Sequence, residues 1–198
     1  MEAKIKIGLF GGSFDPIHYG HLKLANWVRN KLSLNQIIFI PAAIPPHKQN
    51  LKLTDSKHRY RMIQIAIENY SEFTVSAVEL EREGISYTIE TIFYFQEKFL
   101  LSKDALFLII GADSLLDFPN WKEPDKIIEN CQLIVLQRPG INLDRAKPKY
   151  KRKATILQSP LIDVSATDIR RRIKEGGSID KFVLPGVAQY IYEHGLYK

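Results

Sequence analysis

The chain has 198 residues, of which 45% are hydrophobic and 25% are charged, a size and composition suited to one domain with a buried core. Its apolar runs are too short to cross a bilayer, so no membrane partner is expected. The single cysteine, Cys131, excludes an intramolecular disulfide and predicts a reducing, cytoplasmic compartment. The formal charge of +6 favours anionic partners but does not separate nucleotides from nucleic acid.

Strands and helices are expected to alternate along the chain. Short apolar runs bounded by turn residues predict buried strands at 4–10, 36–41, 73–81, 105–111, 133–140 and 154–159. Helical periodicity and capping residues predict helices at 21–32, 55–70, 86–100, 165–177 and 187–198, with Ser86 or Thr88 capping the third. This alternation predicts an α/β fold with a Rossmann-like, doubly wound parallel sheet. We expect residues 1–198 to form a single domain, of which about 160–198 is a mostly helical C-terminal part.

The segment after the first expected strand, GGSFDPIHYGH, has the composition of an anion site. In open parallel sheets, ligands bind at the carboxyl ends of the strands. Gly11 and Gly12 let a ligand approach the main chain, and the Asp–Pro step that follows fits the start of a helix. His18 and His21 then lie one above the other in its first turn. The N-terminus of a helix attracts phosphate, and imidazoles placed there can donate hydrogen bonds to phosphate oxygens.

This segment fits three other kinds of binding site less well. The glycines match neither the dinucleotide fingerprint GxGxxG nor the Walker P-loop. A histidine pair three residues apart could bind zinc, but no convincing third ligand accompanies it. The glycines and the preceding strand therefore favour a phosphate site.

A lysine follows the second expected strand. Pro45 and Pro46 stiffen the stretch that presents His47 and Lys48. A lysine held in this way can neutralise charge that develops on a phosphate during transfer. Taken alone, however, a solvated loop lysine is the simpler interpretation.

The segment VSATDIR predicts a second anion site. Ser165 is a good N-cap, and Asp168 follows three residues later as in a capping box. The helix-start amides, with Ser165, Thr167 and Arg170, would face the first site across the cleft, although a well-capped surface helix explains the same residues. Two such sites suit a polyphosphate held between them. Positioning and electrostatics can then support phosphoryl or nucleotidyl transfer without a covalent intermediate.

The run Arg145–Lys153 holds six basic residues and no acid. It is typical of a nucleic-acid patch or of a solvated loop. Its proline, and the lack of aromatic residues beyond Tyr150, favour the loop. Nucleic acid is therefore not the expected partner.

Together these segments resemble the HxGH nucleotidylyltransferase superfamily and, within it, the bacterial nicotinate-nucleotide adenylyltransferases. The family signature GG(S/T)FDPxHxGH matches Gly11 to His21 throughout. Further family motifs occur in order over almost the whole chain: PPHK at Pro45–Lys48, RxGxSYTxDT at Arg82–Thr91, GxDxxxxxxxW at Gly111–Trp121, RPG at Arg138–Gly140 and IS(S/A)TxIR at Val164–Arg170. Two positions depart from the family: Glu90 replaces an aspartate, and Val164 replaces an isoleucine.

The resemblance implies transfer of the adenylyl group of ATP to nicotinate mononucleotide, giving deamido-NAD and pyrophosphate, with Mg²⁺ on the phosphates. The mononucleotide phosphate attacks the α-phosphate in line, and the implied catalytic residues are His18, His21, Lys48 and Arg170. The two histidines would stabilise the transition state rather than act as nucleophiles. The resemblance implies ATP binding by Gly11, Gly12, Ser13, Phe14, His18, His21, Gly111, Asp113, Arg138, Ser165, Thr167 and Arg170.

For the second substrate, the resemblance implies that Ser86, Tyr87 and Thr88 receive the nicotinate carboxylate, largely through backbone amides. Trp121 would stack on the pyridine ring, although its position alone fits core packing equally well. His47 and Lys48 complete the implied mononucleotide site. Two alternatives stay open: another acceptor (nicotinamide mononucleotide or phosphopantetheine), or a non-catalytic nucleotide- or RNA-binding module that uses Arg145–Lys153. The sequence leaves the oligomeric state open, a homo-oligomer included.

Overall fold

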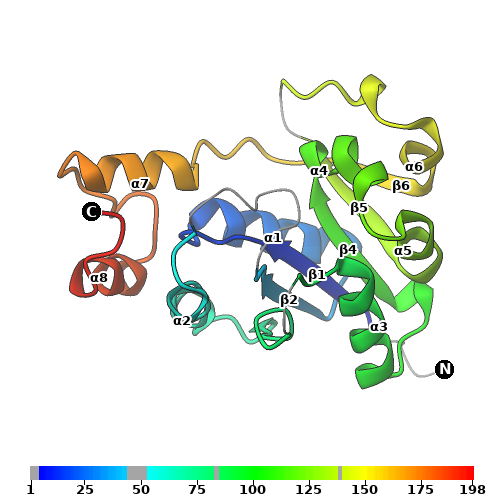
Figure 1. Ribbon diagram of the computed structural model, residues 1–198, viewed down its shortest axis with the longest axis horizontal. Helices are drawn as coiled ribbons and strands as arrows, with labels where there is room; N and C mark the ends of the chain where they lie inside the picture. Colours follow the sequence, from blue (N-terminus) through cyan, green and yellow to red (C-terminus); the bar gives the residue numbers. More distant parts are fainter. Residues whose placement is uncertain (1–4, 44–52, 83–84, 138–139) are drawn as a thin grey trace.

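The computed structural model describes residues 5–43, 53–82, 85–137 and 140–198. Its centre is a parallel sheet of six strands in the order β3-β2-β1-β4-β5-β6 (Figure 1). The strands are β1 (Ile7–Gly12), β2 (Gln36–Pro41), β3 (Phe73–Val75), β4 (Leu106–Gly111), β5 (Gln132–Gln137) and β6 (Ala154–Gln158). The direction of strand progression reverses between β1 and β4. In a Rossmann-like sheet this switch point is where a ligand crevice opens.

Helices cover both faces of the sheet because the side chains of each strand alternate between two cores. On β1, Phe10 faces one core, whereas Ile7 and Leu9 face the other. The first core lies against α1 (Tyr19–Leu32) and α2 (Ser56–Ile67). The second lies against α3 (Thr88–Phe99), α4 (Ala112–Asp117), α5 (Pro124–Asn130) and α6 (Pro148–Lys153). Burial on both faces explains why the strands are almost unbroken apolar runs, and it confirms the doubly wound fold.

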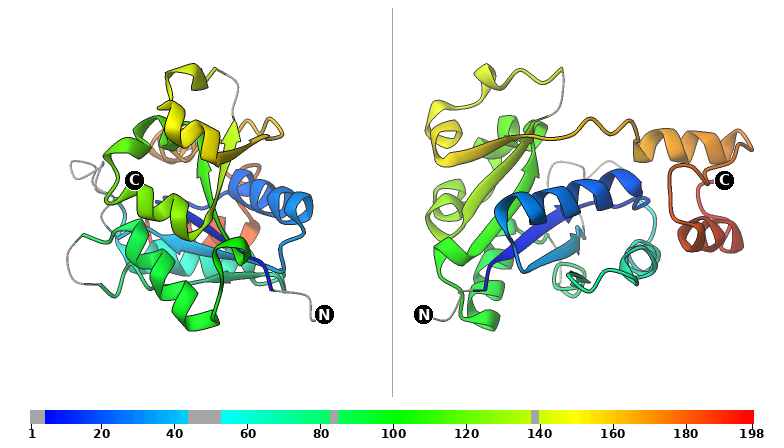
Figure 2. Two further views of the ribbon diagram at one scale, coloured as in Figure 1. Left: turned by 90° about the vertical axis from the view of Figure 1, so that its right-hand side faces the viewer. Right: turned by 180° about the vertical axis from the view of Figure 1, so that it is seen from behind.

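Two further helices, α7 (Ala166–Lys174) and α8 (Pro185–Glu193), lie beyond the carboxyl ends of the strands (Figures 1 and 2). Ile169, Ile173 and Ile191 join the core that lies against α1 and α2. The backbone N–H of Tyr19 at the start of α1 donates a 2.9 Å hydrogen bond to the carbonyl of Phe182. The helical C-terminal part is therefore packed beside the edge of the sheet at which ligands are expected.

Apart from shifts of a few residues at their ends, the expected elements agree with the structure except at four places. The strand expected at 73–81 ends at Val75, because the N–H of Leu80 bonds to the carbonyl of Ala77 at 2.8 Å and the chain turns. The strand expected at 133–140 ends at Gln137, and 138–139 lie outside the described residues. The short helices α4 and α5, and the 3-10 turns Lys103–Ala105, Phe118–Asn120 and Leu143–Arg145, were not foreseen.

The basic run is the fourth difference. We expected a solvated loop at 145–153, but Pro148 begins α6. Tyr150 is buried in the second core, where its ring lies 5.1 Å from that of Phe118. Lys149 pairs with Asp125 at 2.6 Å, and Lys151 pairs with Asp144 at 2.8 Å. The run is thus an amphipathic helix whose charge is partly neutralised by acids elsewhere in the chain. In the part of the chain that the structure describes, no helix has the length and apolar character needed to span a membrane.

Candidate active site

A cavity of about 280 Å³ opens at the switch point between β1 and β4. It brings together two sets of predicted residues that are distant in the sequence. The ends of the two strands contribute Gly11, Gly12, Ser13 and Gly111; the start of α3 and the segment before α5 contribute Ser86, Tyr87, Thr88 and Trp121. Sequence reasoning had missed five polar residues in its wall, Glu79, Thr91, Ser114, Asn120 and Lys122.

Glycine is needed at the two strand ends for different structural reasons. A Cβ placed on Gly11 or Gly111 would meet no protein atom within 4 Å, so both positions leave open space for a ligand against the main chain. A Cβ on Gly12 would lie 3.0 Å from the ring of Phe14. Phe14 has a positive φ of 47° and its side chain is buried in the core, so only its backbone is placed to contact a ligand.

His18 and His21 lie together at the start of α1, as the sequence predicted. Their rings stack with centroids 3.7 Å apart and planes inclined by 22°. The backbone N–H of His18, the N-cap residue, donates to Nδ1 of His21 at 3.3 Å. Because Nδ1 of His21 is the acceptor, the neutral ring carries its proton on Nε2, which is therefore a donor. A Cβ on Gly20 would lie 2.8 Å from Nδ1 of His18, so this glycine makes room for the ring of His18.

The loop between β1 and α1 is fixed by an arginine that the sequence reasoning missed. Arg59 of α2 is buried, and its Nη1 donates to the carbonyl of Ser13 at 2.8 Å. Its Nε donates to the carbonyl of Thr54 at 2.9 Å. Burial lowers the pKa of Arg59, and the nearby carboxylate of Asp15 opposes that shift. An arginine on the apolar face of a predicted helix, beside Met62, was the available signal.

Asp15 receives bonds from two further segments. The hydroxyl of Tyr197 donates to its Oδ1 at 2.6 Å, and the backbone N–H of Thr54 donates to its Oδ2 at 3.3 Å. Burial, followed by the charge of Asp15, raises the pKa of Tyr197, so the phenol stays protonated. Nη1 of Arg170 on α7 donates to the backbone carbonyl of Asp15 at 2.7 Å. Residues from the α2 region and from the C-terminal part of the chain thus hold the loop that leads into His18.

Ser165 caps α7 as predicted. Its Oγ accepts from the N–H of Asp168 at 3.1 Å and donates to a carboxylate oxygen of the same residue at 2.8 Å. Oγ1 of Thr167 accepts from Nη2 of Arg170 at 3.4 Å. The hydrogen bond from Arg170 to the carbonyl of Asp15 joins this second predicted site to the loop before α1. Among the described residues that line the cavity, none belongs to α7 and neither His18 nor His21 is included. Asp113 is exposed on α4 and does not line the cavity either.

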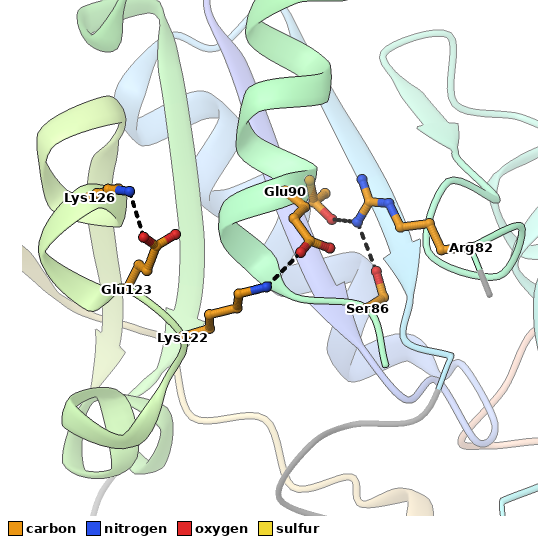
Figure 3. Close-up of polar contacts among 7 residues, drawn as sticks. Arg82, Ser86, Glu90, Lys122, Glu123 and Lys126 are labelled. Atoms are coloured by element: carbon orange, nitrogen blue, oxygen red, sulfur yellow. Dashed lines mark hydrogen bonds and ion pairs between the residues drawn. The ribbon is translucent and has the colours of Figure 1, made fainter. Parts of the chain in front are cut away.

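A buried network holds the start of α3 (Figure 3). Nη1 of Arg82 donates to Oγ of Ser86 and to Oγ1 of Thr91, both at 2.8 Å. The hydroxyl of Thr91 donates to Oε1 of Glu79 at 2.9 Å. Burial raises the pKa of Glu79 to about 7. Tyr87 is the N-cap residue of α3 and its side chain makes no capping bond, so the expected cap by Ser86 or Thr88 is wrong: the hydroxyl of Ser86 is bound by Arg82 instead.

Trp121 combines the two interpretations that the sequence allowed. It follows the 3-10 turn Phe118–Asn120, and its ring packs 5.1 Å from that of Phe118. It is half-buried and also lines the cavity. One part of the ring therefore packs on the core while another is available to a ligand.

Three predicted site residues, His47, Lys48 and Arg138, lie outside the described residues. Of the residues that are described, no group of three or more histidine, cysteine, aspartate or glutamate side chains could hold a metal ion. The zinc interpretation of the histidine pair therefore gains no third ligand among them.

Known proteins share this arrangement of sequence and fold. The cytidylyltransferase-like family matches residues 9–172. A protein of Clostridium beijerinckii is 43% identical over 98% of this chain and 99% of its own length, and one of Thermoanaerobacter sp. is 40% identical over 100% and 97%. Both are named probable nicotinate-nucleotide adenylyltransferase. The structure of a Plasmodium falciparum nicotinic acid mononucleotide adenylyltransferase complexed with NaAD has the same fold, with a TM-score of 0.78 at 22% identity over 98% of this chain and 97% of that one. The chain belongs to the nicotinate-nucleotide adenylyltransferases of the cytidylyltransferase-like family.

Proposed function

We propose that this protein transfers the adenylyl group of ATP to nicotinate mononucleotide, giving deamido-NAD and pyrophosphate for NAD biosynthesis. The observation that carries the proposal is the cavity at the switch point, whose wall joins the strand-end glycines to Tyr87 and Trp121. The same wall thus offers close main-chain approach on one side and an aromatic surface on the other. The names of the curated relatives support the same pair of substrates.

On the ATP side, the phosphates lie against Gly11, Gly12 and Ser13, near the start of α1. The attacking group is a phosphate oxygen of the mononucleotide, which is already an anion and needs no general base. It forms a bond to the α-phosphorus in line with the bond to the leaving pyrophosphate. The protein's part is to position both substrates and to stabilise charge on the transferring group.

Four side chains supply that stabilisation in our proposal. His18 and His21 donate to the oxygens of the α-phosphate, with Nε2 as the donor of His21 because Nδ1 is bound to the backbone of His18. Arg170 adds a positive charge while it fixes the loop through Asp15. Lys48 adds a further charge on the phosphates.

The second substrate lies in the other part of the cavity. Trp121 stacks on the pyridine ring, as an aromatic face suits a flat heterocycle. The carboxylate lies at the start of α3, where the helix carries a partial positive charge. This is the reason to prefer the acid over the carboxamide.

Mg²⁺ enters with ATP in this proposal, as part of the substrate. In our proposal Asp113, which lies in the first turn of α4 directly after Gly111, meets the ribose or the metal. The metal would supply further charge neutralisation on the β- and γ-phosphates.

Pyrophosphate release tests the proposal. The purified protein is given ATP and Mg²⁺ with nicotinate mononucleotide, nicotinamide mononucleotide or phosphopantetheine. We expect the highest kcat/KM with nicotinate mononucleotide and a dinucleotide product of matching mass. Turnover with phosphopantetheine but not with either mononucleotide would refute the proposal.

A further inference from the structure

Lys122 bridges the two segments that form the mononucleotide part of the cavity. Its Nζ lies 2.9 Å from Oε1 of Glu90 at the start of α3. The same Nζ lies 4.1 Å from the centroid of the Tyr87 ring, within the range of a cation–π contact. Figure 3 shows Lys122 reaching from the segment before α5 to Glu90.

We infer that Lys122, through Glu90 and Tyr87, is a positioning residue that fixes the spacing between Trp121 and the start of α3, and so determines affinity for the mononucleotide. This inference rests on the proposed function. Lys122 directly follows Trp121 in the chain and lines the same cavity. A displacement of Lys122 therefore displaces the aromatic wall relative to Tyr87.

The two segments of the mononucleotide part of the cavity are each held by contacts of their own. On the inside, Arg82 binds Ser86 and Thr91, and this network holds only the α3 side. Trp121 is attached to its own side through Phe118. α3 and α5 also pack together in the second core, and Nε2 of Gln96 donates to the carbonyl of Asn130 at 2.9 Å at the other end of the two helices. Beside the cavity, the contacts of Lys122 with Glu90 and Tyr87 join the two segments, so we infer that the local spacing of the walls depends on them.

The ionisation and the exposure of the Lys122–Glu90 pair both suit this role. The hydrogen bond to Glu90, together with its charge, raises the pKa of Lys122, and the same hydrogen bond lowers the pKa of Glu90, so both groups are ionised at neutral pH. The side chain of Lys122 is 42% exposed and that of Glu90 is 40% exposed. An ion pair so open to solvent contributes little to folding stability, so we expect its loss to appear in substrate affinity and not in unfolding.

The test compares three variants with a matched control. Lys122→Met removes the charge but keeps an unbranched side chain, Glu90→Gln removes the opposite charge, and Glu90→Asp keeps that charge on a side chain one methylene shorter. The control, Lys126→Met, removes the neighbouring Glu123–Lys126 pair, which joins the N-cap residue of α5 to its first turn and is not in the cavity wall (Figure 3). KM and kcat are measured for each substrate at saturating levels of the other.

We expect KM for nicotinate mononucleotide to rise about three- to tenfold in all three variants, with kcat, KM for ATP and Tm unchanged. The double variant Glu90→Gln/Lys122→Met should be less impaired than the product of the single effects, because both act on one contact. Lys126→Met should match the wild type.

Two results would overturn the inference. One is an unchanged mononucleotide KM in Lys122→Met and Glu90→Gln. The other is an equal rise of KM for ATP, which would indicate a general structural effect. Both differ from failure of the proposed function, which would appear as no wild-type turnover with nicotinate mononucleotide and would remove the inference with it.

Discussion

Around Ser13 and Asp15, the backbone is held by side chains that solvent hardly reaches: Arg59 is 1% exposed and Asp15 is 3% exposed. Across the cavity, the start of α3 and the segment with Trp121 meet through Glu90 and Lys122, whose side chains are about 40% exposed. Buried charged hydrogen bonds are costly to break, whereas exposed ion pairs are not. We infer that the loop between β1 and α1, the loop side of the site, is preorganised for the transition state. The mononucleotide side is held by weaker contacts, whose loss would change substrate affinity.

The largest effect should come from the histidine pair. His21→Ala removes a donor aimed at the charge that develops in the transition state, and such donors are worth roughly 10²–10³-fold in kcat. We expect that loss of kcat, measured by pyrophosphate release, in a variant that remains folded. A variant with wild-type kcat would remove His21 from the catalytic account.

Tyr197→Phe tests whether the loop side is fixed by buried bonds. The change removes the hydroxyl that donates to Asp15 at 2.6 Å. A buried acceptor that loses its donor costs roughly 1–3 kcal/mol, so we expect a lower free energy of unfolding in urea and a reduced kcat. Tyr192→Phe is the control, since Tyr192 is 44% exposed and its hydroxyl accepts only a long 3.4 Å bond from Ile179. Equal stability of the two variants would contradict the role of Tyr197.

The pH dependence of stability tests the inner network of the mononucleotide side. Burial raises the pKa of Glu79 from 4.5 to about 7, so between these values the folded protein binds a proton that the unfolded chain has released. The stability contributed by this proton is fully present below pH 4.5 and is lost as the pH rises through 7.

Glu79→Gln removes this titration while keeping an oxygen that accepts from Thr91. Between pH 5 and pH 8 the wild type should therefore lose roughly 1–3 kcal/mol more free energy of unfolding than the variant does. Parallel urea denaturation curves at the two pH values measure the difference. The same pH slope in both proteins would show that Glu79 titrates normally.

The smallest effect is expected in α6, which lies outside both regions. Neutralising Lys149, Lys151 and Arg152 removes exposed charges and leaves Tyr150 in the core. We expect kcat and both KM values to stay within about twofold of the wild type. A large loss of rate would show that α6 contributes to the active site.

The site features that could be predicted from the sequence are those formed by residues close together in the chain. The glycine segment, the stacked histidines and the Ser165 cap each depend on residues a few positions apart, and all three are found in the structure. The parallel sheet followed from unbroken apolar runs, because burial on both faces leaves no polar alternation.

What it could not predict depends on contacts between distant segments. Nothing near Asp15 indicates that Tyr197 and Arg59 reach its loop. The basic run was expected to be a loop because charge dominates its composition, whereas one buried tyrosine anchors it as a helix. The Glu90 departure from the family became interpretable only when the structure placed Lys122 beside it.

One steady-state series tests the central distinction most directly. Nicotinate mononucleotide is varied at saturating ATP and Mg²⁺ for the wild type, His21→Ala and Lys122→Met. We predict that His21→Ala lowers kcat with little change of KM, and that Lys122→Met raises KM with little change of kcat. If both variants lowered kcat and raised KM to the same extent, the two regions would not have separate roles.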